Sequence, residues 1–158
     1  MRLLFLGDVV GRAGRNAVIG ALPGLRADWG LDFIAINAEN AASGFGLTAD
    51  IANQLFEAGA DCLTLGDHAF DQKEMLGHIE REPRILRPLN YAKSAPGRGA
   101  GLFEVSRGRK VFFAVALGRV FMNRPFDDPF SAIDAALKKA LLGGVADAVI
   151  VEIHAEAT

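Results

Sequence analysis

The sequence predicts an α/β domain built around a mainly parallel sheet, and two observations indicate this fold. Short, nearly continuous apolar runs at residues 2–6, 32–37 and 62–65 each end in glycine or polar residues, which is typical of strands buried on both faces. Helical patterns lie between these runs, so that strand and helix alternate as they do around parallel sheets. The 158 residues suffice for one core, and we expect a single domain over residues 1–158.

Three helices are expected in the first half of the chain. The first spans residues 15–28 and is interrupted by the Pro23-Gly24 pair. The second spans residues 48–58, and its first residue, a threonine, offers an N-cap. The third spans residues 72–81. Together with the apolar runs, these helices give the order βαβαβ followed by a helix.

The chain changes character after the third helix. The segment 83–101 is rich in Pro, Gly and Arg, and we expect an extended loop there. Residues 101–106 and 110–117 flank the sequence Arg-Gly-Arg at 107–109 and predict a β-hairpin. Because a hairpin is antiparallel, the sheet is expected to be mixed, with mainly parallel strands.

One more helix and one more strand follow. The helix spans residues 128–142 and is ended by the Gly143-Gly144 pair. Its apolar face carries Phe130, Ile133, Leu137 and Leu141. The strand spans residues 148–153, and an uncovered final strand is a pairing liability. We therefore interpret the chain as a fragment of a longer protein.

Composition and charge exclude several classes of protein. With 51% hydrophobic and 23% charged residues, the chain does not have the composition of a disordered protein. The net charge is −2 and the basic residues are scattered, so we expect neither stable nucleic-acid binding nor membrane binding. The lone Cys62 cannot form an intrachain disulfide, and the N-terminal apolar run is too short for a signal or a membrane span. These features predict a cytoplasmic protein, with homo-oligomerisation left open.

Metal-competent side chains follow the predicted parallel strands. In open α/β sheets, ligands bind beyond the carboxyl ends of the strands. The residues at these ends are Asp8, Glu39, Asn40, Asp67, His68 and His154. Each has an ordinary structural explanation by itself, such as a helix cap or a turn. Three carboxylates meeting at one edge without a Lys or Arg would repel one another unless cations lie among them, and the coincidence therefore predicts a metal site.

The mixture of carboxylate, amide and imidazole ligands favours Mn or Fe(II), with Zn as an alternative. Two such ions about 3.5 to 4 Å apart bind a phosphoryl group and turn a bridging water into a hydroxide for in-line attack. The leaving oxygen then needs a proton. His68, beside Asp67, is the candidate donor because an imidazole titrates near neutral pH. Phe45, in a glycine-bounded loop, is either a substrate contact that stacks on a base or part of a turn.

A dinucleotide-binding domain of the Rossmann type is the rival interpretation of the same region. Gly7, Gly11 and Gly14 lie between a strand and a helix, and the acidic Glu39 ends the second strand. The spacing is G-x-x-x-G-x-x-G, however, and Asp8 would place an anion where a pyrophosphate needs backbone amides. We rank this interpretation below the metal site.

Six segments together carry a resemblance to a known family. They are residues 4–12, 38–42, 44–48, 65–68 with the following Asp71-Gln72, 117–122 and 154–158. In order and in spacing, these segments resemble the YmdB-type bacterial metallophosphoesterases. The resemblance implies a calcineurin-like αββα sandwich with a dinuclear iron or manganese centre. It also implies hydrolysis of small phosphodiesters, notably 2′,3′-cyclic nucleotides.

The resemblance also implies roles for individual residues. The metal ligands it implies are Asp8, Glu39, Asn40, Asp67 and His154. The first three hold the first metal, with Glu39 bridging to the second, and the last two belong to the second metal. His68 becomes the proton donor.

The chain departs from the family pattern in two ways. Where the family has Gly-Asn-His, this chain has Asp67 between Gly66 and His68, and the added negative charge predicts tighter metal binding but a less electrophilic ion. Family members also continue into a His-x-His motif that completes both metal shells, and none follows His154 here. We therefore expect half a sandwich, an incomplete second site and weak or no activity. A non-catalytic metal- or nucleotide-binding module is the alternative.

Overall fold

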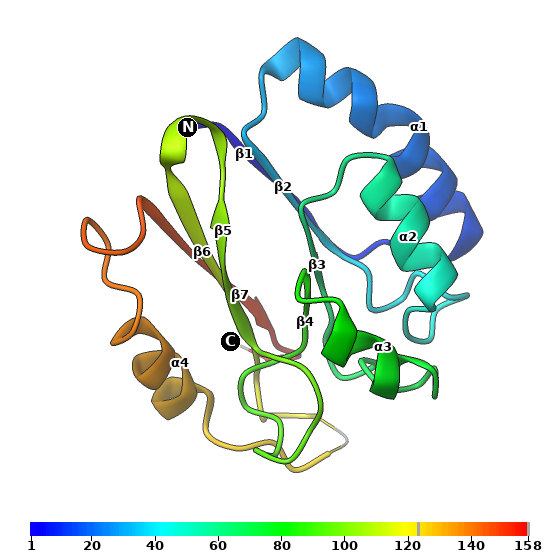
Figure 1. The fold of residues 1–158 in the computed structure, drawn as a ribbon. Coiled ribbons are helices and arrows are strands. Elements are labelled where there is room, and N and C mark those ends of the chain that lie inside the picture. Colours follow the sequence, from blue (N-terminus) through cyan, green and yellow to red (C-terminus); the bar gives the residue numbers. More distant parts are fainter. Residues whose placement is uncertain (123, 158) are drawn as a thin grey trace.

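The fold, given by a computed structural model that describes residues 1–122 and 124–157, consists of four layers (Figure 1). Three helices cover one sheet, a second sheet packs against its other face, and a fourth helix lies beyond the second sheet. In chain order the elements are β1 (Leu3–Leu6), α1 (Gly11–Trp29), β2 (Phe33–Asn37), α2 (Ala49–Glu57), β3 (Cys62–Thr64), α3 (Met75–Arg81), β4 (Ile85–Leu86), β5 (Ala100–Glu104), a 3-10 turn (Ser106–Gly108), β6 (Lys110–Leu117), α4 (Pro129–Leu137) and β7 (Ala148–His154). Thr158, the last residue of the 154–158 motif, lies outside the described residues.

Sheet A contains β1, β2, β3 and β4, which lie side by side in that order. All three pairs of neighbouring strands are parallel. Sheet A confirms the three strands predicted from the apolar runs. The expectation of an extended loop over residues 83–101 is wrong at Ile85 and Leu86, two fully buried residues that form β4. A strand of two residues shows no periodicity in the sequence. The rest of the segment is held by Arg87, whose guanidinium donates to three backbone carbonyl oxygens of the same segment.

Sheet B contains β5, β6 and β7. The predicted hairpin is confirmed, since β5 and β6 pair antiparallel, and β7 pairs parallel with β6 along its whole length. Strand pairing is mainly parallel, as predicted, but the strands do not form one mixed sheet: the hairpin pairs with β7 and not with β1 to β4. The layered arrangement agrees with the sandwich that the family resemblance implies. β1 and β7 are edge strands of their sheets.

An apolar layer joins the two sheets. Side chains alternate along β2, so that Ile34 and Ile36 face the helices whereas Phe33 faces sheet B. The ring of Phe33 lies 5.2 Å from that of Phe103 and 6.2 Å from that of Phe113, centroid to centroid. β2 is buried on both faces, which explains its continuous apolar sequence.

Helix α1 differs from its prediction. It starts at Gly11, four residues early, and continues through Pro23 without the expected interruption. A proline inside a helix removes one backbone hydrogen bond, but the preceding Leu22 is fully buried in the core beneath the helix. Burial therefore stabilises the helix across the proline. Gly30 ends it in the left-handed conformation with φ of 58°, donating to the carbonyl oxygens of the last turn.

Helices α2 and α3 follow the predictions more closely. The Thr48 side chain accepts a hydrogen bond from the backbone N–H of Ile51 and confirms the predicted N-cap of α2. α3 starts at Met75, three residues later than expected, and buries Met75 and Ile79 against sheet A. Within the described parts of the chain, no helix has the length and hydrophobicity needed to cross a membrane.

Helix α4 is shorter than its prediction. It begins after Asp128, whose carboxylate caps the helix, and ends at Leu137 instead of Leu142. The expected apolar face is wrong at two positions, because Phe130 is 78% exposed and Leu141 is 66% exposed. Within α4, the residues that pack against the sheet B cluster are Ala136 and the predicted Leu137.

Asp32 ties the two sheets together at the end of the sandwich where β2 begins. Its carboxylate accepts hydrogen bonds from the Ser106 hydroxyl, from the Arg109 guanidinium at 2.9 Å and from the backbone N–H of Arg2 at 2.7 Å. The Ser106 hydrogen bond first, and then the Arg2 N–H, lower the pKa of Asp32 to about 2. The charged form of Asp32 is therefore the one that the fold stabilises.

We expect Asp32→Asn to lower the melting temperature at pH 7, with the difference from wild type shrinking as the pH falls. A carboxyl whose pKa is depressed on folding stabilises the fold above its unfolded pKa of about 3.8 and loses that contribution as the pH falls towards 2. Thermal unfolding followed by circular dichroism between pH 2 and 7 measures the effect. Asp28→Asn, on the exposed end of α1, is the matched control. A difference between wild type and Asp32→Asn that is constant over this pH range would contradict the assignment.

Candidate metal centre

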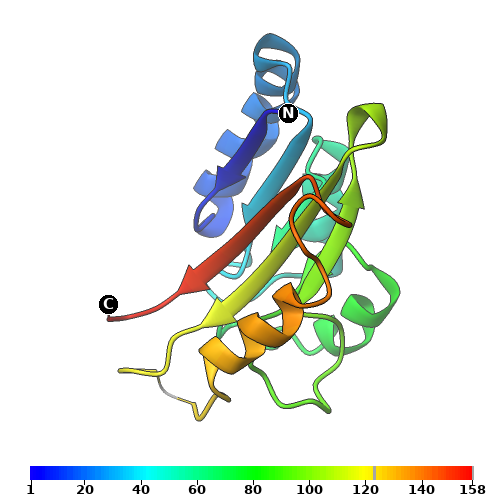
Figure 2. The same cartoon turned by 90° about the vertical axis from the view of Figure 1, so that its left-hand side faces the viewer.

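The carboxyl ends of the parallel strands bring the predicted ligands to one edge of the sandwich. β1, β2 and β3 run parallel in sheet A, and Figure 2 shows β7 of sheet B pointing the same way as β1. Residues at the ends of both sheets therefore meet there, although Asp8 and His154 lie near opposite ends of the chain.

Glu39, Asp67 and His154 form a compact group. One ligand atom of each lies within 4.8 Å of the others. Nδ1 of His154 lies 2.6 Å from a carboxylate oxygen of Glu39, and its Nε2 lies 3.8 Å from a carboxylate oxygen of Asp67. This group joins three of the five predicted metal ligands, drawn from both sheets.

The carboxylate of Glu39 has the features of a ligand without its cation. Glu39 is 1% exposed, and its Oε2 is buried with no hydrogen-bond partner among the described residues. A buried carboxylate oxygen without a donor is costly unless a cation is bound to it. Gly66 makes room for this carboxylate: a Cβ at that position would lie 2.0 Å from Oε2 of Glu39. The donor set and the unpartnered oxygen both fit a hard or borderline divalent cation.

Asp8 and Asn40 form a neighbouring pair. Nδ2 of Asn40 donates to both carboxylate oxygens of Asp8, at 2.9 and 3.1 Å. The backbone fixes the pair as well, because the N–H of Gly11 donates to the carbonyl oxygen of Asn40 at 3.0 Å. Asp8 is exposed and does not belong to the three-residue group. Asn40 follows Glu39 directly in the chain, so the two sets are adjacent.

His68 lies apart from the group, in a setting of its own. Its Nδ1 lies 2.6 Å from a carboxylate oxygen of Asp71, and the other oxygen of Asp71 lies 3.5 Å from the Arg124 guanidinium. The ring of Phe45 stands edge-to-face with the imidazole, 5.6 Å between centroids, and Phe45 is 61% exposed. Asp71 thus fixes one nitrogen of His68, which leaves Nε2 for other partners.

Tyr91 binds the backbone just after β3. Its hydroxyl hydrogen-bonds to the carbonyl oxygens of Gly66 and Asp67, at 3.1 Å each. Burial raises the pKa of Tyr91 to about 12, so the hydroxyl keeps its proton and donates. Sequence patterns did not indicate this contact, because it joins the β3 end to the segment after β4.

His154 carries a proton when no other cation is present. Its hydrogen bond to Glu39 and the charges of Glu39 and Asp67 raise its pKa to about 9, against the opposing effect of burial. The same negative charge that stabilises this imidazolium would stabilise a bound metal ion.

Two buried polar residues of the site were not among the sequence predictions. Nδ2 of Asn37, the last residue of β2, donates to a carboxylate oxygen of Glu152 in β7 at 2.6 Å. Burial raises the pKa of Glu152, a shift that its contacts with Thr64 and Asn37 oppose. Asn37 and Glu152 each precede a predicted ligand by two positions within apolar strands. A polar residue at that spacing is the signal that would have found them.

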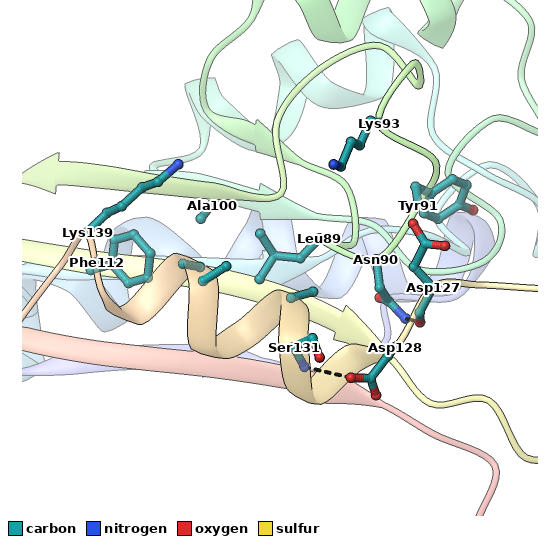
Figure 3. A pocket seen from close by; sticks show the side chains of 13 residues that line it. Leu89, Asn90, Tyr91, Lys93, Ala100, Phe112, Asp127, Asp128, Ser131 and Lys139 are labelled. Carbon is teal, nitrogen blue, oxygen red and sulfur yellow. Dashed lines mark hydrogen bonds between the residues drawn. The ribbon is translucent and has the colours of Figure 1, made fainter.

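A cavity of about 670 Å³ lies away from this group, between α4 and the segment after β4 (Figure 3). Leu89, Phe112 and the alanines of α4 form its apolar wall, and Lys93 and Lys139 lie at its margin. None of the predicted metal ligands lines it. The metal-competent group is therefore at the strand ends and not in this cavity.

Comparison with known proteins identifies the family of the chain. The sequence matches the model of the YmdB-like protein family over residues 4–158. The chain belongs to the YmdB-like family. It is 38% identical to a 2′,3′-cyclic-nucleotide 2′-phosphodiesterase of Bacillus subtilis, over the whole of this chain and 58% of that protein.

Two solved structures share the fold of this chain. A hypothetical protein from Thermus thermophilus is 43% identical, with a TM-score of 0.89 over 99% of this chain and 59% of that one. A phosphatase from Mycoplasma pneumoniae is 33% identical, with a TM-score of 0.85 over 97% of this chain and 54% of that one. The chain thus spans somewhat more than half the length of these relatives.

Proposed function

We propose that this chain is the N-terminal part of a calcineurin-like, metal-dependent phosphodiesterase that hydrolyses 2′,3′-cyclic nucleotides or related small phosphodiesters. The observation that carries the proposal is the group of Glu39, Asp67 and His154 at the strand ends, with a buried Glu39 oxygen that has no partner among the described residues. The name of the Bacillus subtilis relative supports the substrate class.

The proposed ligands divide into two sets. Asp8, Glu39 and Asn40 would hold one divalent cation, and Asp67 and His154 would hold a second, with Glu39 shared between them. Iron or manganese suits these donors, with zinc as the alternative. When bound, such ions neutralise the phosphoryl charge and lower the pKa of an attacking water.

His68 is proposed as the proton donor to the leaving oxygen. The Asp71 carboxylate accepts from Nδ1 of His68, so the proton that moves is the one on Nε2. The other carboxylate oxygen of Asp71 lies 3.5 Å from the Arg124 guanidinium, which holds the Asp71 side chain from its other side. Phe45, exposed beside the imidazole, is placed to stack on the base of a nucleotide.

The dinucleotide-binding interpretation has less support. Backbone N–H groups of the turn after β1 already donate to the end of β2: Val9 to the carbonyl oxygen of Asn37, and Gly11 to that of Asn40, each at 3.0 Å. They are therefore not free to bind a pyrophosphate. The non-catalytic module stays as the second candidate, since it uses the same ligands.

The test combines metal analysis with an assay. We expect the 158-residue chain, reconstituted with Mn²⁺, to retain the metal by mass spectrometry and to hydrolyse 2′,3′-cyclic AMP slowly, with a chelator abolishing turnover. His68→Gln should reduce kcat by about 10²- to 10⁴-fold, the usual contribution of a general acid, while metal content stays unchanged. Metal retention without any turnover would favour the non-catalytic module. Failure to bind metal would refute both.

Asp67→Asn tests the charge of the second ligand set. We expect about tenfold weaker Mn²⁺ binding, or about 1.4 kcal/mol, because a carboxylate is replaced by a neutral amide. Turnover at saturating metal should rise, since less negative charge leaves the ion more electrophilic. Isothermal titration calorimetry and the cyclic AMP assay measure the two effects. Asp71→Asn is the matched control: it should lower turnover through His68 and leave Mn²⁺ affinity unchanged. Unchanged affinity and turnover in Asp67→Asn would contradict the prediction.

A further inference from the structure

Two hydrogen bonds connect the ends of β2 and β7 across the sandwich. In a strand, residues two apart face the same side, so Glu152 and His154 of β7 both point to sheet A. Asn37, the last residue of β2, and Glu39, in the turn after it, hydrogen-bond to these two residues. Asn37 pairs with Glu152 at 2.6 Å, and Glu39 pairs with His154 at 2.6 Å. The inner pair lies directly behind the pair of proposed metal ligands.

The inner pair is buried in a layer whose other residues, apart from Thr64, are apolar. Asn37 is 5% exposed and Glu152 is 9% exposed, and the neighbouring inter-sheet positions are occupied by residues such as Phe33 and Ile150. Burying a carboxyl and an amide costs free energy, and apolar residues of similar volume often serve stability equally well. Stability alone is therefore a weak explanation for polar residues at these two positions.

The contacts of Asn37 explain why an amide side chain occupies this buried position. Besides the bond to Glu152, its Oδ1 accepts from the backbone N–H of Glu39 at 3.2 Å, and its Nδ2 lies 3.4 Å from the Glu39 carboxylate. One side chain therefore holds the backbone and the carboxylate of Glu39 and, through Glu152, the strand that carries His154. Without it, the two ligands would depend on apolar packing for their separation.

We propose that Asn37 and Glu152 are positioning residues, which hold Glu39 and His154 at ligand distance before a cation binds. This inference rests on the proposed metal site, and it adds two residues that act through the ligands without contacting the metal. Groups that hydrogen-bond to ligands typically change metal affinity by about 10- to 100-fold when they are removed.

Truncation and conservative replacement of Glu152 should differ. Glu152→Ala removes the acceptor of the Asn37 amide, and we expect it to weaken Mn²⁺ binding by about 10- to 100-fold in calorimetry of the whole chain. Glu152→Gln keeps a carbonyl oxygen that accepts from the Asn37 amide, so affinity should stay near wild type. Asn37→Ala should weaken Mn²⁺ binding at least as much as Glu152→Ala, because it also removes the two contacts with Glu39. The double variant should be little worse than Asn37→Ala alone, because that variant already lacks the bond to Glu152.

A stability control separates positioning from folding. Val111→Ala also truncates a fully buried side chain between the sheets, at the end of β6 that pairs with Ala148 and is therefore remote from His154, so it should lower the melting temperature and leave Mn²⁺ affinity unchanged. A second readout needs no metal: ¹⁵N NMR of the His154 imidazole should report its hydrogen bond to Glu39 in wild type and Glu152→Gln, and its loss in Glu152→Ala.

Each outcome decides the proposal. Wild-type affinity in Glu152→Ala, or equal losses in the Ala and Gln variants, would overturn it. If wild type binds no Mn²⁺, the proposed function fails, and the NMR signal of His154 in the metal-free variants still decides the positioning role. In that case, an unchanged His154 signal in metal-free Glu152→Ala would overturn the positioning role.

Discussion

Replacing Gly66 with alanine is expected to weaken Mn²⁺ binding by about 100-fold or more, the upper range for changes that disturb metal ligands. The added Cβ would lie 2.0 Å from Oε2 and 2.4 Å from the carboxylate carbon of Glu39. Neither atom can remain in place, because real Cβ atoms do not approach so closely. Glu39 therefore has to leave the position in which it faces Asp67 and His154. Calorimetric titration with Mn²⁺ measures the loss.

Gly20→Ala is the matched control for this prediction. Gly20 lies on the exposed face of α1, where an added Cβ would meet no neighbouring atom within 4 Å, so alanine fits there and favours the helix. The variant should bind Mn²⁺ like wild type and be at least as stable. If Gly66→Ala keeps wild-type affinity, Glu39 is not a metal ligand in this conformation.

Phe33→Ala is expected to reduce the free energy of unfolding by about 3 to 5 kcal/mol, the usual loss for a fully buried phenylalanine. Phe33 is 1% exposed and its ring contacts Phe103 of β5 and Phe113 of β6, so the change opens a cavity between the two sheets. Domains of this size are stable by only about 5 to 15 kcal/mol, and the loss is therefore a large share of the total. Urea denaturation followed by circular dichroism gives the value.

Phe130→Ala tests the same substitution on the surface. Phe130 is 78% exposed on α4, and its truncation should change the free energy of unfolding by less than about 0.5 kcal/mol. Equal losses in the two variants would contradict the packing of sheet B on Phe33. They would also contradict the exposure of Phe130 on the outer face of α4.

The sequence was most informative about the strand ends. Parallel strands align their carboxyl ends, so placing Glu39 and Asp67 after buried runs was enough to predict that they meet. His154 was predicted from the same rule, and it meets them although it belongs to the other sheet. Local patterns determine where a strand ends, and that was all the prediction needed.

Features that depend on distant contacts were less accessible. Nothing local in residues 100–117 indicates that the hairpin pairs with β7 and so starts a second sheet. The two residues of β4 are a strand only because β3 lies beside them. Asn37 and Glu152 are 115 positions apart, and each alone is an ordinary polar residue in an apolar run. Such features follow from tertiary packing, which residue periodicity does not encode.

The pairing of Glu39 with His154 also bears on how long the folded molecule survives. These residues are 115 positions apart and belong to different sheets, so a cation held by both would act as a reversible cross-link that closes most of the chain into a loop. Binding to the folded state alone raises its stability by about 2.7 kcal/mol when the free cation is at 100 times its Kd. The population of open, protease-sensitive molecules would then fall about 100-fold. Metal supply would thereby influence the lifetime of the protein as well as its chemistry.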